Sequence, residues 1–212
     1  MNFLELINKC LIELNYRQVN SFSELVKNDH KKIKNVMNII NNEICNTENW
    51  NFLLRRTSIY IPVNVTEVDN TIGGRIAFVL INKEKYQFSE EFEPFLTGHA
   101  NSKTYSILNN KLLFPASEQE RNVEIIYYTT NSVIDSDNNE KDEMNKADDT
   151  PLIPMPFVQP LLVYGTCMRL KGNPQHIRFA YWASMYKDAL LNLKSKASVY
   201  AKETPQVRLF RS

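Results

Sequence analysis

The apolar residues of this chain change their spacing twice, and the order of the three patterns limits the folds open to it. They recur at helical spacing to about residue 45, alternate with polar residues between about 56 and 134, and return to helical spacing after a Pro-rich entry near residue 151. A chain of 212 residues can bury one core, or one core and a smaller satellite. This order predicts a helical body that carries an inserted β region.

Two helices are expected before the β region. Phe3, Ile7 and Cys10 share one apolar stripe of the first helix. Ser21 and Glu24 have the spacing of a capping box, so a second helix is expected to start there and to run to about Cys45.

Two further helices are expected after the β region. The third should run from about Phe157 to Leu170, and Gly165 within it indicates close approach of another backbone. Gly172-Asn173-Pro174 should end this helix and start the fourth, with the Asn as N-cap.

The middle region is typical of a small antiparallel sheet. Asn109 and Asn110 lie between two strand-like runs, and Asn tolerates the positive φ of a tight hairpin turn. The sequence therefore predicts an α+β protein. Its expected parts are a bundle body of about four helices (1–55 and 151–202), an inserted small antiparallel β domain (56–134), an acidic surface loop (135–150) and an extended C-terminal tail (203–212).

The net charge of +1 conceals two oppositely charged segments. Between residues 134 and 150, seven acidic residues accompany two lysines, whereas from residue 157 to the end nine Lys or Arg accompany two acidic residues. Such segments can steer assembly between copies of one protein. The alternative is a solvated loop and a solvated helix face.

Three lysines in the second helix, Lys27, Lys31 and Lys34, are candidates for lining a path for DNA phosphates. The alternative is again a solvated helix face. The end of the chain combines apolar and basic side chains, which could add a strand to a neighbour's sheet or fray in solvent. This candidate contact segment comprises Gln206, Val207, Arg208, Leu209, Phe210 and Arg211.

The residue types on which most enzymes depend are scattered. The three His and three Cys have no metal-ligand spacing, and the five Gly form no phosphate-binding loop. We expect no enzyme activity, no catalytic or metal-binding residue and no cofactor. A hydrolase of unfamiliar type is the alternative, and it would need a pocket with shifted carboxylates.

The first residues lack a basic leader, and no run of about 18 apolar residues is present to span a membrane. We therefore expect a soluble protein without a membrane partner, made in a reducing compartment.

Residues spread over most of the chain resemble the tail tubular protein A family of short-tailed bacteriophages, the adaptors between portal and tail. The N-terminal helices lead to Asn49-Trp50-Asn51-Phe52, and a Pro-containing strand follows at 59–63. Leu113-Phe114-Pro115 and the run at 125–128 come later. The Pro-rich segment 149–157 then opens the C-terminal helices, as in that family.

The resemblance implies a structural virion protein in the tail or neck, synthesised in the host cytoplasm. It implies a homo-oligomeric ring of twelve copies bound to the portal protein and to other tail proteins, with a central channel for double-stranded DNA. The helices would form the ring body, the β insertion would meet tail components, and the segment from Gln206 to Arg211 would meet the portal.

A small nucleic-acid-binding module is the alternative function. It would use the Lys-rich second helix and the basic C-terminal helix. Such a module should bind duplex DNA with a steep salt dependence, whereas an isolated adaptor should bind DNA feebly.

Overall fold

The computed structural model describes residues 1–200, except for the side chains of 197–200, and the chain divides into two compact units. The first, which we call the helical unit, is formed by Met1–Phe52 and by the chain from Asn131 onward; the second, the β unit, is Leu53–Thr130. The predicted C-terminal tail (203–212), with its candidate contact residues Gln206 to Arg211, lies outside the described residues.

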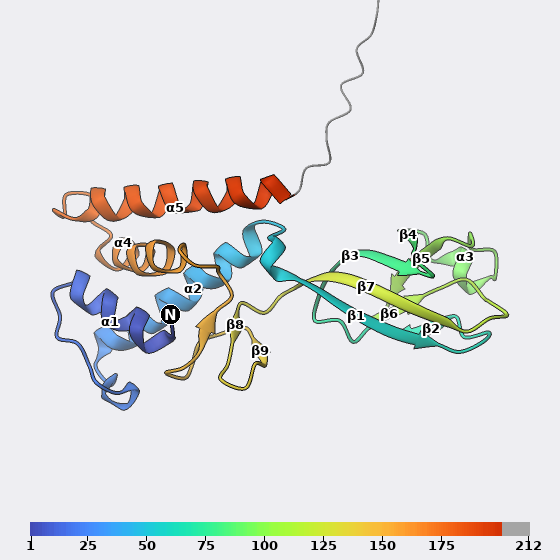
Figure 1. Ribbon diagram of the computed structural model, residues 1–212, viewed down its shortest axis with the longest axis horizontal. Helices are drawn as coiled ribbons and strands as arrows, with labels where there is room; N and C mark the ends of the chain where they lie inside the picture. The colour runs from blue at the N-terminus through green and yellow to red at the C-terminus, as the bar shows by residue number, and fades with distance from the viewer. Residues whose placement is uncertain (201–212) are drawn as a thin grey trace, which may run out of the picture. The chain divides into compact units, whose positions relative to one another are not determined.

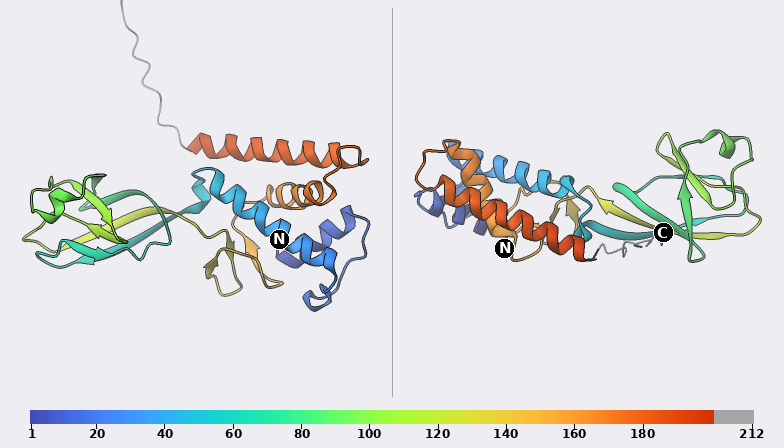
Figure 2. Two further views of the ribbon diagram at one scale, coloured as in Figure 1. Left: turned by 180° about the vertical axis from the view of Figure 1, so that it is seen from behind. Right: turned by 90° about the horizontal axis from the view of Figure 1, so that it is seen from above.

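The helical unit packs its C-terminal helices onto its N-terminal ones (Figures 1 and 2). Its helical elements are α1 (Phe3–Glu13), the 3₁₀ turns η1 (Phe22–Glu24) and η2 (Asn51–Leu53), α2 (Asn28–Thr47), the π-helical turn η3 (Gln159–Tyr164), α4 (Gly165–Lys171) and α5 (Phe179–Tyr200). The turn η3 and α4 contact α1 and α2, and α5 packs on η3 and α4. α5 is therefore the outer helix of this unit.

The helix boundaries agree with the sequence pattern only in part. α1 and its buried stripe of Phe3, Ile7 and Cys10 are confirmed. The capping box of Ser21 and Glu24 exists, but it caps η1, and α2 begins four residues later at Asn28. A capping box shows only where a helical turn can begin. Whether the helix continues past that turn depends on packing against other parts of the fold, so the sequence could not show the break between η1 and α2.

The C-terminal helices differ from prediction in two ways. Gly172, with φ of +50°, ends α4 as expected, but α5 begins at Phe179 and not beside Asn173. A Cβ at Gly165 would lie 3.0 Å from the Tyr186 ring and 3.3 Å from Cδ1 of Ile40. Gly165 thus makes room for side chains of α5 and α2, and not for another backbone.

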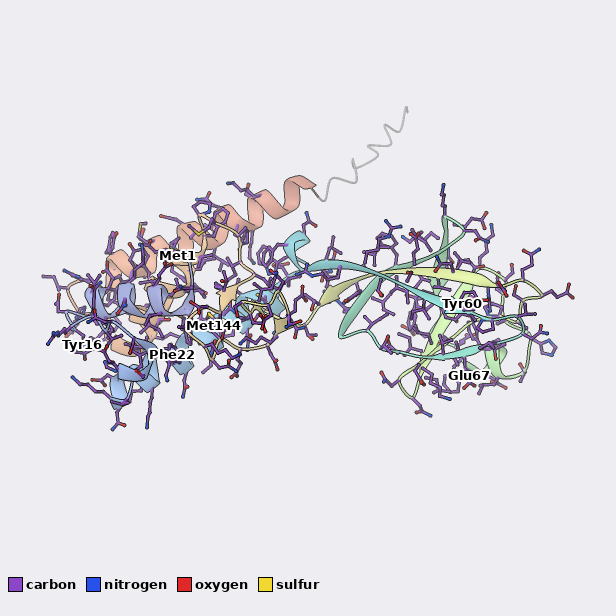
Figure 3. All side chains as sticks on the ribbon, turned by 60° about the horizontal axis from the view of Figure 1, so that its bottom comes forward. Met1, Tyr16, Phe22, Tyr60, Glu67 and Met144 are labelled. Atoms are coloured by element: carbon purple, nitrogen blue, oxygen red, sulfur yellow. The ribbon has the colours of Figure 1, made fainter. Side chains whose placement is uncertain are left out.

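The predicted acidic loop contains regular structure. β8 (Val133–Ile134), β9 (Glu140–Lys141) and β10 (Thr150–Pro151) form a three-stranded antiparallel sheet in the order β10-β8-β9. Met144, labelled in Figure 3, is buried in the same segment.

Asparagines of α2 hold this segment through hydrogen bonds. Asn38 donates to the carbonyl of Met144 and accepts from its amide, both at 3.0 Å. Asn41 donates to the Ser132 carbonyl and hydroxyl at 3.1 and 2.9 Å, and Asn42 Oδ1 lies 2.6 Å from that hydroxyl. We call Asn38, Asn41 and Asn42 the asparagine clasp. It fixes a polar segment that has too few large apolar side chains to order itself.

A buried carboxylate closes the same segment. Asp149 Oδ2 accepts hydrogen bonds from the amides of Asn145 and Lys146, both at 2.6 Å, and Oδ1 lies 2.7 Å from Lys141 Nζ. Burial alone raises the pKa of Asp149, but Lys141 and the two amides more than offset this, so the pKa is lowered. The Asp149 carbonyl also accepts from the Phe3 amide at 2.8 Å, which ties the segment to α1.

The β unit is built on one nearly closed sheet of seven strands. The strands are β1 (Leu54–Ile61), β2 (Glu67–Asp69), β3 (Gly74–Ile81), β4 (Glu84–Phe88), β5 (Thr104–Leu108), β6 (Lys111–Leu113) and β7 (Arg121–Thr129), and the short helix α3 (Glu93–Leu96) follows β4. Their order is β1-β7-β3-β4-β5-β6-β2, antiparallel except for the β4–β5 pair.

Alternating residues on these strands enclose the core of the β unit, as period-2 patterning requires. The core comprises Ile61, Val79, Ile81, Tyr105, Leu112, Phe114, Val123 and Ile125. The predicted hairpin at Asn109 and Asn110 is confirmed, because both residues have positive φ (+50° and +60°) and join β5 to β6.

The prediction of a helical bundle body with a small antiparallel β insertion is wrong. The protein is a mixed α and β structure, 37% helix and 24% strand, dominated by the seven-stranded sheet. The β4–β5 pair is parallel, and a second sheet stands among the helices. Local periodicity could not indicate this, since β2 and β6 have three residues each and are fixed only by their partners.

Candidate assembly surface

The outer face of the last helical region carries apolar side chains that the helical unit does not cover. Ile177, just before α5, is 93% exposed, and Tyr181, Met185 and Leu191 on α5 are also exposed. Tyr181 and Met185 are four residues apart and share one helix face. We call Ile177, Tyr181 and Met185 the α5 stripe.

The inner face of α5 is fixed firmly, so the α5 stripe stands on a rigid support. Trp182 is fully buried, donates from Nε1 to Glu13 Oε2 at 3.0 Å and stacks on the His176 ring with centroids 5.1 Å apart. Nearer the C-terminal end, Lys194 Nζ lies 2.8 Å from Glu48 Oε1.

One residue of the α5 stripe also contacts the helical turn beneath it. The Tyr181 and Tyr164 rings meet edge to face with centroids 5.5 Å apart, and their hydroxyls are 3.4 Å apart. This hydroxyl contact, with burial, raises the pKa of Tyr164 to about 12. The Tyr164 phenol therefore stays neutral near pH 7.

A second apolar surface lies at the other end of α5. It is a groove of about 250 Å³ whose lining residues are Asn51, Phe52, Pro154, Met155, Phe157, Leu193 and Lys196. Met155 is 61% exposed at its edge, and the Lys196 ammonium lies 5.0 Å from the centre of the Phe157 ring. We call this surface the Met155 groove. It has the apolar centre and polar rim of a protein-binding surface.

The Met155 groove was not predicted, because its residues come from three separate parts of the chain. Phe52 follows α2, Met155 and Phe157 precede η3, and Leu193 belongs to α5. The apolar positions near Trp50 and the Pro-rich entry were visible in the sequence, but nothing in their spacing indicated that they meet.

Two buried cysteines are brought together in the helical core. Cys10 of α1 and Cys167 of α4 have their sulfur atoms 3.5 Å apart, and both are buried. The hydrogen bond with Cys167, together with burial, raises the pKa of Cys10, and burial raises that of Cys45 to about 12. Thiols held in the protonated form are poor nucleophiles.

The predicted DNA-channel lysines lie at the start of α2. Lys27 is its N-cap, and Lys27 and Lys31 are exposed. Lys34 is half-buried, with its ammonium 5.1 Å from the centre of the Phe22 ring. Two of the three are thus free to meet a solvent-borne anion, and the third is used in packing.

Within residues 1–200, no cluster of three or more His, Cys, Asp or Glu side chains is arranged to hold a metal ion. None of the helices in that part of the chain is long and apolar enough to cross a bilayer.

Compared with known proteins, the chain matches no protein-family model and no curated protein. The resemblance to the tail tubular protein A family therefore stays a prediction.

Proposed function

We propose that this protein is a structural virion adaptor that assembles as a ring of twelve copies between a phage portal and tail. The observation that carries the proposal is the pair of apolar surfaces at the two ends of α5, the α5 stripe and the Met155 groove. Two different surfaces on one subunit allow a head-to-tail contact, and repeated head-to-tail contacts close into a ring when the rotation permits.

The chemistry of the two surfaces supports their pairing. The α5 stripe presents an aromatic ring and a flexible thioether, Tyr181 and Met185, and these side chains are common at interface centres. The Met155 groove offers aromatic and aliphatic walls, with Lys196 at its rim. Contact between copies would remove both surfaces from water.

The remaining parts fit the same role. A channel that lets DNA pass should not hold it tightly, and exposed Lys27 and Lys31 on a chain of net charge +1 supply only a modest positive field. The segment from Gln206 to Arg211 would contact the portal, and the β unit would contact other tail proteins.

Native mass spectrometry of the full chain, alone and mixed with the portal protein, tests this proposal. We expect a species that contains twelve chains of 24.7 kDa each. Tyr181→Glu on the α5 stripe and Met155→Glu in the Met155 groove should each prevent it, because a charge at the centre of an apolar contact is costly to bury. Ile39→Glu is the matched control, since Ile39 is an exposed apolar residue on α2 outside both surfaces.

Two outcomes would count against the proposal. If rings form equally well with Tyr181→Glu and Met155→Glu, the interface between copies does not include the α5 stripe or the Met155 groove. A monomer that ignores the portal but retains duplex DNA at low salt would favour the nucleic-acid-binding module instead.

A further inference from the structure

A polar cavity lies in the helical unit where the chain leaves α1, passes through η1 and enters α2. Its volume is about 420 Å³, and its lining residues are Tyr16, Arg17, Gln18, Val19, Glu24, Lys27, Asp29 and His30. Tyr16 and Phe22, labelled in Figure 3, mark this connection between the two helices. Neither the α5 stripe nor the Met155 groove shares any residue with it.

The N-terminus of α2 opens beside this cavity without a side-chain cap. Lys27 is the N-cap residue, and its side chain makes no capping hydrogen bond. The Lys31 amide donates to the Lys27 carbonyl at 3.1 Å, so the amides of Asn28, Asp29 and His30 precede the first intrahelical bond. Uncapped amides and the helix dipole of a 20-residue helix favour an anion at this position.

An independent observation at the same place is a buried imidazole that lacks a partner. His30 is only 6% exposed and lines the cavity, and its Nδ1 has no hydrogen-bond partner among the described residues. A buried polar atom without a hydrogen-bond partner destabilises the fold. Nδ1 is enclosed in this conformation, so a small rotation of the imidazole, in the tautomer that carries the proton on Nδ1, would let it donate to an acceptor oxygen of a ligand in the cavity.

The charges around the cavity favour an anionic ligand. Arg17 and Lys27 line it, and Lys32 and Lys171 line an adjacent hollow of about 180 Å³ that shares Tyr16 and Asp29 with it.

Two carboxylates oppose these four cations. Glu24 Oε1 already accepts the Ser21 amide at 3.1 Å in the capping box, so part of its charge is compensated locally. Asp29, in the first turn of α2, is the carboxylate that remains close to the cavity. The cavity itself is lined by two cations and two carboxylates, and the cations outnumber the carboxylates, four to two, once the adjacent hollow is included.

We propose that this cavity binds a phosphate group, through the Arg17 guanidinium, the His30 imidazole and the amides at the start of α2. Free phosphate fits better than carboxylate, because it presents four acceptor oxygens and the cavity offers three separate kinds of donor. Lys27 adds positive charge at the mouth. The phosphate can be free or part of a nucleic acid backbone, since a backbone phosphodiester also presents charged non-bridging oxygens, two in number.

Isothermal titration calorimetry of the full chain tests the site, with inorganic phosphate in one arm and a short DNA duplex in the other. We expect Arg17→Gln to weaken binding by about tenfold or more, as loss of a charged hydrogen-bond donor should. His30→Gln should weaken it by a similar factor. His99→Gln is the matched control, because His99 is an exposed histidine in the β unit.

Thermal unfolding of each variant, followed in parallel, separates loss of the site from loss of the fold. His30 is buried, so His30→Gln can destabilise the helical unit, but Arg17 is exposed and its replacement should leave the unfolding temperature unchanged. Arg17→Gln thus keeps the test decisive if His30→Gln fails to fold.

Phosphate binding that Arg17→Gln reduces would support the site as one for small phosphates. Duplex binding that the same variant reduces, without binding of free phosphate, would support it as a contact for a nucleic acid backbone. No binding of either probe, or binding that Arg17→Gln and a folded His30→Gln leave unchanged, would overturn the proposal. The result is separable from ring formation, which depends on other residues.

Discussion

The two units differ in how the chain builds them. The β unit is one continuous segment, Leu53–Thr130, held by backbone ladders around a single apolar core. The helical unit is assembled from two segments that this insertion separates, and its decisive contacts join residues far apart in the sequence. Examples are the asparagine clasp on Ser132 and the Trp182–Glu13 hydrogen bond.

This difference assigns different tasks to polar groups. In the β unit, the polar groups that matter most are those of the backbone, because the pairing of the strands determines most of the fold. In the helical unit, apolar stripes can slide or rotate against one another, whereas directional hydrogen bonds to buried partners define one arrangement. The clasp and Asp149 therefore specify where the 131–151 segment sits, and α5 is positioned by Glu13 and Glu48.

The largest expected effect distinguishes the two cores directly. Trp182→Ala should destabilise the helical unit by about 3–5 kcal/mol, because it removes a fully buried ring and its hydrogen bond to Glu13. Both tryptophans of the chain, Trp50 and Trp182, belong to the helical unit. Denaturant unfolding followed by the fluorescence of the remaining Trp50 measures the change.

Phe114→Ala is the matched variant in the β unit, since Phe114 is also fully buried. Phe114→Ala should lower the unfolding free energy, followed by the β-sheet signal of circular dichroism, by a similar amount. The unfolding transition followed by tryptophan fluorescence should not change. If Phe114→Ala shifts the tryptophan transition as far as Trp182→Ala does, the two units unfold together and the comparison fails.

An intermediate effect is expected at Asp149. Its pKa is lowered in the folded protein, so its contribution to stability is present above the unfolded value of 3.8 and is lost as the pH falls through the lower folded value. Asp149→Asn should destabilise the helical unit by about 2 kcal/mol near pH 7, because Lys141 loses its charged partner. Unfolding followed by tryptophan fluorescence between pH 7 and acid conditions gives the profile.

The acid profile provides the control for this prediction. The unfolding free energy of Asp149→Asn should fall less steeply below pH 3.8 than that of the original chain. Asp137→Asn, at an exposed site in the same segment, should show the same fall as the original chain. Equal profiles for all three proteins would show that Asp149 does not hold this segment through its charge.

The smallest effect concerns the hairpin of the β unit. Asn110 has φ of +60°, a conformation that Gly adopts without a Cβ penalty, so Asn110→Gly should stabilise the β unit by up to about 0.5 kcal/mol. Asn110→Ala should cost about 1 kcal/mol. Circular dichroism should record both changes, with no shift in tryptophan fluorescence. A destabilising Asn110→Gly or a stabilising Asn110→Ala would contradict a locally determined turn.

Much of the local structure could be predicted from the sequence. The stripe of Phe3, Ile7 and Cys10, the Asn109–Asn110 turn and the helix stop at Gly172 all follow from the conformational preferences of the residues at those positions. The candidate lysines at the start of α2 were visible too, but the uncapped helix end and the buried His30 beside Lys27 were not. A histidine in a Lys-rich stretch gives no local sign that it is buried.

The sequence by itself determined where helices and strands alternate, because side-chain periodicity and turn preferences act over a few residues. Tertiary structure alone decided the closure of seven strands into one sheet, the parallel β4–β5 pair and the second sheet among the helices. It also decided that Phe52, Met155 and Leu193 share one groove and that Cys10 meets Cys167. The physical reason is that pairing and burial depend on which distant residues supply the missing hydrogen-bond partners and the apolar contact, and no local pattern records those partners.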